Sequence, residues 1–161
     1  MKKLLIAILG LLPCTAFASC GGEKSSDTSN STEVVEENAV LTLSEAIDAK
    51  LIKLFDNLVI SENNPVIIDF NATWCGPCQR FAPIYDSVAE RYNGQAIFLS
   101  IDTDEYPSVA EAYKISAIPT VVFLMPGGGE LGRQTGLMSE EQFVDYVNQL
   151  IATSAGESDS I

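Results

Sequence analysis

Apolar residues between Leu41 and Ala152 follow two alternating patterns. Some segments have apolar positions three and four residues apart, which indicates amphipathic helices, and others are short runs that are apolar almost throughout, which indicates buried strands. Alternation of helices and strands along a chain is typical of α/β folds, in which helices cover a sheet. The pattern therefore predicts an α/β domain over residues 41–152, with helices on both faces of a central sheet.

The individual elements can be placed along this domain. A first helix is predicted from the N-cap Ser44 onward, with apolar residues at helical spacing at Ile47, Leu51, Leu54, Phe55 and Leu58. The apolar run 66–70 after Pro65 suits a central parallel strand that is buried on both faces. The remaining predicted elements are a helix over 81–92 containing Pro83, a strand over 96–101, a short helix over 108–113, strands over 120–125 and 131–135 joined by a glycine turn, and a last helix over 143–151.

Residues 1–19 have the layout of a bacterial secretory signal peptide. Lys2 and Lys3 precede the apolar run 4–12, and small residues follow that run. The run is too short for a membrane-spanning helix, which needs about 20 apolar residues. We therefore expect this segment to direct export of the protein.

Two cleavage sites compete at the end of this segment. Ala16-Phe17-Ala18 fits ordinary signal peptidase and would give a soluble exported protein, whereas Phe17-Ala18-Ser19-Cys20 resembles a lipobox, in which Cys20 is lipidated. We favour the lipobox, because the next residues have the composition of a tether and because the other site leaves a free thiol near the mature N-terminus. The prediction is a periplasmic protein that is anchored to a membrane by a lipid on Cys20.

The two ends of the domain are polar. Residues 20–40 are rich in Gly, Ser, Thr and acidic residues, and so polar a composition predicts a disordered tether. Residues 153–161 are similarly polar and predict a flexible tail.

Charge and composition exclude several classes of function. The formal net charge is −13, and so acidic a protein repels phosphate backbones, which excludes nucleic acid as a partner. The absence of histidine removes the commonest metal ligand and the Ser-His and Cys-His dyads. Of the four cysteines, Cys14 and Cys20 belong to the targeting region, which leaves Cys75 and Cys78 for chemistry.

Cys75 and Cys78 form a C-x-x-C motif that follows the buried strand and begins a helix. The helix N-terminus favours a thiolate, so the pKa of Cys75 should fall from about 8.5 toward 7. Cys75 would attack a substrate disulfide, and Cys78 would then displace the substrate and close the Cys75–Cys78 disulfide. A zinc site would need two further ligands, and a structural disulfide would close too short a loop to stabilise much. A redox pair that needs no metal or cofactor is the favoured interpretation.

Several features of the sequence occur in the order typical of one protein family. They are Asp69, Trp74-Cys75-Gly76-Pro77-Cys78, Pro83, Ile118-Pro119-Thr120 and Gly136. Together they closely resemble thioredoxin, over roughly residues 41–151. The resemblance implies the thioredoxin fold, an α/β fold with a central mixed sheet and helices on both faces, and a monomer that acts on proteins with disulfides.

The resemblance also implies supporting catalytic residues. Pro119 would be a cis-proline beside the sulfur atoms, whereas the residues alone would make it a proline at the start of a strand. Asp69 would be the family's buried acid below Cys78. Physically, a carboxyl in an apolar strand should have a raised pKa, which suits Asp69 to take the Cys78 proton through a water. The alternative for Asp69 is a strand-end residue that caps a loop.

The same resemblance implies a surface that binds substrate. Its members are Trp74, Gly76, Pro77, Ile118 and Gly136. Trp74 would flank the active site rather than serve as a core aromatic, and the backbone of Ile118 would pair with the substrate main chain. Two residues depart from the family: Asn71 stands where many thioredoxins carry an aromatic, and Phe98 where many bacterial ones carry a lysine near the buried acid.

The residues between the cysteines bear on the direction of electron flow. Gly76-Pro77 resembles the reducing thioredoxins, with potentials near about −270 mV, whereas oxidants of about −120 mV resemble Cys-Pro-His-Cys. The sequence thus predicts a protein-disulfide reductase outside the cytoplasm, with a membrane electron shuttle as its reductant. The alternatives are a disulfide oxidase or isomerase with the same site, and a thioredoxin-fold binding module without turnover.

Overall fold

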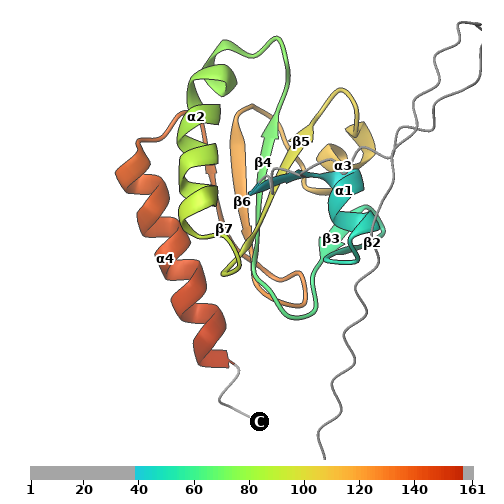
Figure 1. Cartoon of the computed structure of the whole chain (residues 1–161). Coiled ribbons are helices and arrows are strands. Elements are labelled where there is room, and N and C mark those ends of the chain that lie inside the picture. The colour runs from blue at the N-terminus through green and yellow to red at the C-terminus, as the bar shows by residue number, and fades with distance from the viewer. Residues whose placement is uncertain (1–38, 158–161) are drawn as a thin grey trace, which may run out of the picture. The chain divides into compact units, whose positions relative to one another are not determined.

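Strand β4 (Val66–Asn71) runs through the middle of a five-stranded sheet in the computed structural model, which describes residues 39–157 (Figure 1). Its first five residues are all buried, as expected for a strand between two layers of helices. The predicted signal peptide, Cys20, nearly all of the predicted tether and the end of the predicted tail lie outside the described residues, so these predictions stay predictions.

The sheet is mixed, as predicted. The strands lie in the order β1-β5-β4-β6-β7, and β1, β5 and β4 are parallel to one another while β6 and β7 join by antiparallel pairing. Besides β4, the strands are β1 (Val40–Thr42), β5 (Ile97–Asp102), β6 (Thr120–Leu124) and β7 (Glu130–Thr135). The predicted strands over 66–70, 96–101, 120–125 and 131–135 are therefore confirmed.

Helices cover both faces of the sheet. Helices α2 (Gly76–Arg91) and α4 (Glu140–Glu157) lie against one face, and α1 (Leu43–Asp48) and α3 (Pro107–Ala112) against the other (Figure 1). Successive residues of β4 alternate between these faces, because a strand has a period of two. Ile67 belongs to the apolar cluster under α2 and α4, and Ile68 and Phe70 to the opposite cluster. Asp69 therefore points toward the α2 side.

The first predicted helix is wrong beyond Asp48. Helix α1 begins after the N-cap Thr42 rather than Ser44, and Thr42 forms a capping box with Glu45. The chain then forms a hairpin of β2 (Lys53–Phe55) and β3 (Leu58–Ile60) in antiparallel pairing.

A two-residue turn explains this hairpin. Asp56 and Asn57 connect its strands with φ values of 50° and 62°, the left-handed conformation that hairpin turns require and that Asp and Asn tolerate. The hairpin is attached to the domain through Val59, which is fully buried and whose N–H donates to the Tyr113 hydroxyl at 2.9 Å.

Both predicted ends of the domain need correction. The composition places Val40 in the tether, but strand β1 begins there and pairs with β5. It places residues 153–157 in the flexible tail, but α4 continues through them to Glu157. The hydroxyls of Thr153 and Ser154 donate to carbonyls of the preceding turn, so these polar side chains are satisfied within the helix. Over residues 39–157 no helix is long and apolar enough to cross a membrane.

Candidate functional site

The two cysteines lie where the end of β4 meets the beginning of α2, at the top of Figure 1. Cys75 is the N-cap of α2, and its Sγ accepts from the N–H of Cys78 at 3.3 Å. Pro77 stands in the first turn, where its missing N–H removes no helical hydrogen bond. Free N–H groups and the positive end of the helix dipole therefore face Cys75, which favours a thiolate there.

Cys75 and Cys78 form a disulfide with their Cα atoms 5.3 Å apart. Each residue is only 4% exposed, and the pair packs against Ala72 and Ile118. The three-residue separation thus brings the sulfur atoms into bonding distance, as predicted. The described residues contain no cluster of three or more His, Cys, Asp or Glu that could hold a metal ion.

A cis peptide bond joins Ile118 to Pro119, as the resemblance implied. Ile118 packs against the cysteine cluster, so the cis bond lies beside the disulfide. Gly136 adjoins this loop, because its N–H donates to the Pro119 carbonyl at 2.8 Å. Its φ of +92° is a conformation that side chains disfavour, although a Cβ would meet nothing within 4 Å there. The backbone conformation, rather than a lack of space, therefore favours glycine at position 136.

Trp74 is 70% exposed and is not a core aromatic. Its indole Nε1 donates to Asp104 Oδ2 at 2.7 Å, which fixes the ring beside the cysteines. Asp104 was missed by sequence reasoning. The signal that could have found it is its place just after β5, because β4 and β5 are parallel and both end at the edge of the sheet that holds the cysteines.

Asp69 is buried in the middle of the sheet, opposite Ser100 on β5 and Val121 on β6. The pKa of its carboxyl is raised to about 7, chiefly by burial; a hydrogen bond from Asn71 opposes this rise, and the negative charge of Asp86 adds to it. The predicted rise of this pKa is confirmed, and the alternative of a loop cap at the strand end is wrong.

A cavity of about 420 Å³ lies beside Asp69 and Cys78, and both residues line it. Its wall includes Tyr85 and Asp86 from α2 and Ser100 from β5.

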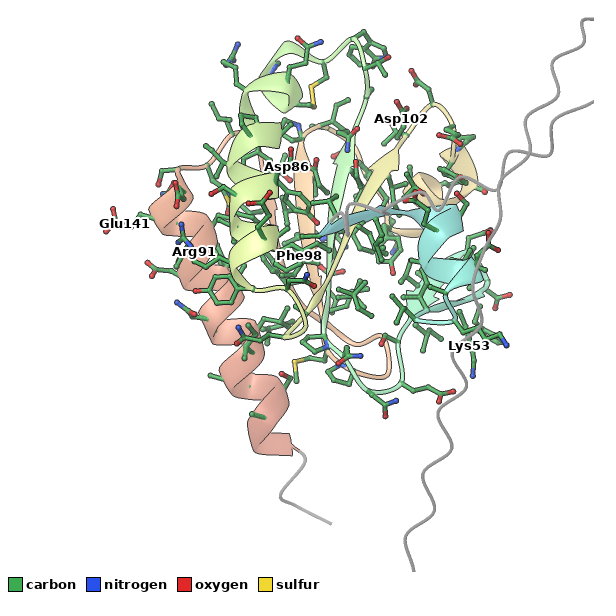
Figure 2. All side chains as sticks on the ribbon, viewed as in Figure 1. Lys53, Asp86, Arg91, Phe98, Asp102 and Glu141 are labelled. Carbon is green, nitrogen blue, oxygen red and sulfur yellow. A yellow bond between two sulfur atoms is a disulfide. The ribbon has the colours of Figure 1, made fainter. Side chains whose placement is uncertain are left out.

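Figure 2 shows Asp86 on α2 and Phe98 on β5, with the disulfide at the upper end of α2. Phe98 is buried in the apolar cluster under α2 and α4, so the position where many bacterial thioredoxins carry a lysine holds no charge here. The cavity was not predicted.

Comparisons with known proteins agree with this geometry. A family model described as Thioredoxin matches residues 47–149. Thioredoxin Y1 from chloroplasts of Arabidopsis thaliana is 38% identical over 93 residues, which cover 58% of this chain and 54% of that protein. A thioredoxin M-type from pea (Pisum sativum) chloroplasts is 39% identical over 97 residues, which cover 58% of this chain and 56% of that protein.

A thioredoxin-like protein of Synechocystis is covered more fully. It is 36% identical over 97 residues, which cover 60% of this chain and 91% of that protein. By contrast, the chain spans little more than half the length of the two chloroplast proteins.

Proposed function

The chain belongs to the thioredoxin family, and from this we propose that it is a protein-disulfide reductase that transfers electrons from Cys75 and Cys78 to disulfides of other proteins. The observation that carries the proposal is the disulfide-bonded pair at the N-terminus of α2, beside the cis Ile118–Pro119 bond. The redox group is this pair itself, so no further cofactor is required.

The proposed reaction has two steps. In the reduced protein, the Cys75 thiolate attacks one sulfur of the substrate disulfide, which forms a mixed disulfide and releases the other substrate sulfur as a thiolate that takes a proton from water. The Cys78 thiol then gives its proton to Asp69 and attacks Cys75 Sγ. This closes the Cys75–Cys78 disulfide and releases the second substrate thiolate, so two electrons pass to the substrate.

The substrate would lie across the surface beside the disulfide. Exposed Trp74, held by Asp104, gives this surface an apolar wall, and Gly136 leaves open space near Pro119. We propose that the backbone of Ile118 pairs with the main chain of the substrate, because Ile118 packs against the cluster that contains both cysteines.

A measurement of the redox potential tests the direction of transfer. We expect equilibration with glutathione buffers to give a potential close to about −270 mV, because Gly76-Pro77 separates the cysteines as in reducing thioredoxins. The fraction of Cys75–Cys78 disulfide is measured by alkylation of free thiols and mass spectrometry. A potential above about −180 mV would contradict the reductase and favour the oxidase or isomerase.

We further propose that the protein works outside the cytoplasm, anchored through a lipid on Cys20 and reduced by a membrane electron shuttle. The support is sequence alone: the basic and apolar residues before Cys20 and the lipobox-like Phe17-Ala18-Ser19-Cys20. We expect full-length protein in a bacterial host to fractionate with membranes and to incorporate labelled fatty acid, and Cys20→Ala to abolish the label. A soluble, unlabelled exported protein would instead support cleavage after Ala18.

A further inference from the structure

The carboxamide of Asn71 bridges the ends of two neighbouring strands. Its Nδ2 lies 2.8 Å from Ser100 Oγ, 3.1 Å from Asp69 Oδ2 and 3.2 Å from the Asp69 carbonyl oxygen. Asn71 and Asp69 are two residues apart on β4, so their side chains lie on the same face of the strand. Ser100 stands opposite Asp69 on β5, which places its hydroxyl within reach of the same amide.

These residues line one cavity together with Cys78. Asp69, Asn71 and Ser100 are all in its wall, and so are Asp86, Tyr85 and Glu45. The described residues that line the cavity include no lysine or arginine. Within the part of the chain that the structure describes, Asn71 is the side chain that donates to the Asp69 carboxyl, and Oδ1 of that carboxyl has no partner. The neutral amide of Asn71 thus stabilises the Asp69 carboxylate by a hydrogen bond, where a cation would do so by its charge.

We propose that Asn71 is a positioning residue for proton transfer: with Ser100 it holds the Asp69 carboxyl beside Cys78 and stabilises the carboxylate, and the cavity returns the proton to solvent. This inference rests on the proposed function, because it concerns the step in which Cys78 closes the disulfide. The proton leaves the Cys78 thiol for the Asp69 carboxylate, the Cys78 thiolate attacks Cys75, and Asp69 later releases the proton through the cavity.

Three other titratable side chains lie around Asp69 in the cavity wall, and of these Asp86 acts in the opposite sense to Asn71. On α2, Asp86 contributes a negative charge that raises the pKa of Asp69, and the Tyr85 hydroxyl is occupied as a donor to the carbonyls of Ile67 and Leu99. Glu45 from α1 also lines the cavity. The hydrogen bond from Asn71 lowers the pKa of Asp69, so its loss removes a favourable contact to the charged form.

The experiment compares the full-length protein with Asn71→Leu, which keeps a similar volume and removes the donor. Two readouts are recorded against pH: the titration midpoint of the Asp69 carboxyl by carbon NMR, assigned with Asp69→Asn, and the rate of the second step. The second step is followed with an aromatic disulfide whose thiolate product absorbs visible light. We expect both midpoints to move up by about one pH unit in Asn71→Leu, with the first step, the Cys75 attack, unchanged.

Two further variants control for a merely structural effect. Asn71→Gln keeps an amide donor and should restore the midpoint most of the way toward wild type. Asn71→Asp keeps the shape, replaces the donor by a like charge and should shift the midpoint further than Asn71→Leu, which also tests the inference if the leucine variant does not fold. Equal midpoints in wild type and in a folded Asn71→Leu or Asn71→Asp would overturn the role of Asn71. A wild-type protein that reduces no disulfide would overturn the proposed function instead.

Discussion

Replacing Cys75 by serine is expected to reduce the turnover of protein disulfides to below about a thousandth of the wild-type rate. The serine hydroxyl remains protonated at neutral pH and cannot form the mixed disulfide, so the first step has no nucleophile. The measurement is the reduction of insulin with dithiothreitol as electron source. Circular dichroism of the variant checks that the loss of activity does not arise from unfolding.

Cys78→Ser is the matched control, because it also removes one sulfur from the pair. Here Cys75 still attacks, but nothing resolves the product, so the variant should accumulate mixed disulfides with substrate proteins that reducing agent releases. Cys75→Ser should trap none. Equal insulin reduction by wild type and Cys75→Ser would leave the binding module as the remaining interpretation, since catalysis would then not depend on the cysteine pair.

The sheet could be predicted from sequence where burial dominates. The run 66–70 and the run 97–101 are nearly continuous apolar segments, and only a strand between two helical layers buries so short a run on both faces. The β2–β3 hairpin was missed because Leu51, Leu54 and Leu58 fit helical spacing although they are 39% to 40% exposed. The deciding signal was the Asp56-Asn57 turn, which periodicity alone does not register.

The candidate site could also be predicted only in part from the sequence. The cysteine pair and the raised pKa of Asp69 follow from local facts, namely a three-residue spacing and a carboxyl inside an apolar strand. The contacts of Asn71 with Ser100 and of Trp74 with Asp104 join residues 29 and 30 positions apart. Such contacts depend on the register between β4 and β5, which no local pattern specifies. The cavity likewise appears only when the neighbouring elements are assembled.

The second large effect is expected on the free energy of unfolding, which should depend on pH through Asp69. The pKa of Asp69 is raised from 3.8 to about 7, so between these pH values the folded protein binds a proton that the unfolded chain has lost. The free energy of unfolding therefore falls as pH rises through this window. At about 1.4 kcal/mol for each tenfold change in proton affinity, the loss above pH 7 is roughly 4 kcal/mol relative to acidic solution.

Asp69→Asn should remove this pH dependence, because the amide resembles the neutral acid in shape and does not ionise. At pH 8 to 9 we expect the variant to be more stable than wild type by up to roughly 4 kcal/mol, and near pH 4 the difference should largely disappear. Urea unfolding of the disulfide form measures this, since the bonded cysteines do not titrate. Asp145→Asn, which alters an exposed carboxyl on α4, is the control and should run parallel to wild type. Parallel curves for Asp69→Asn as well would mean that Asp69 is charged in the folded protein throughout this range, and that it holds no proton for Cys78 near neutral pH.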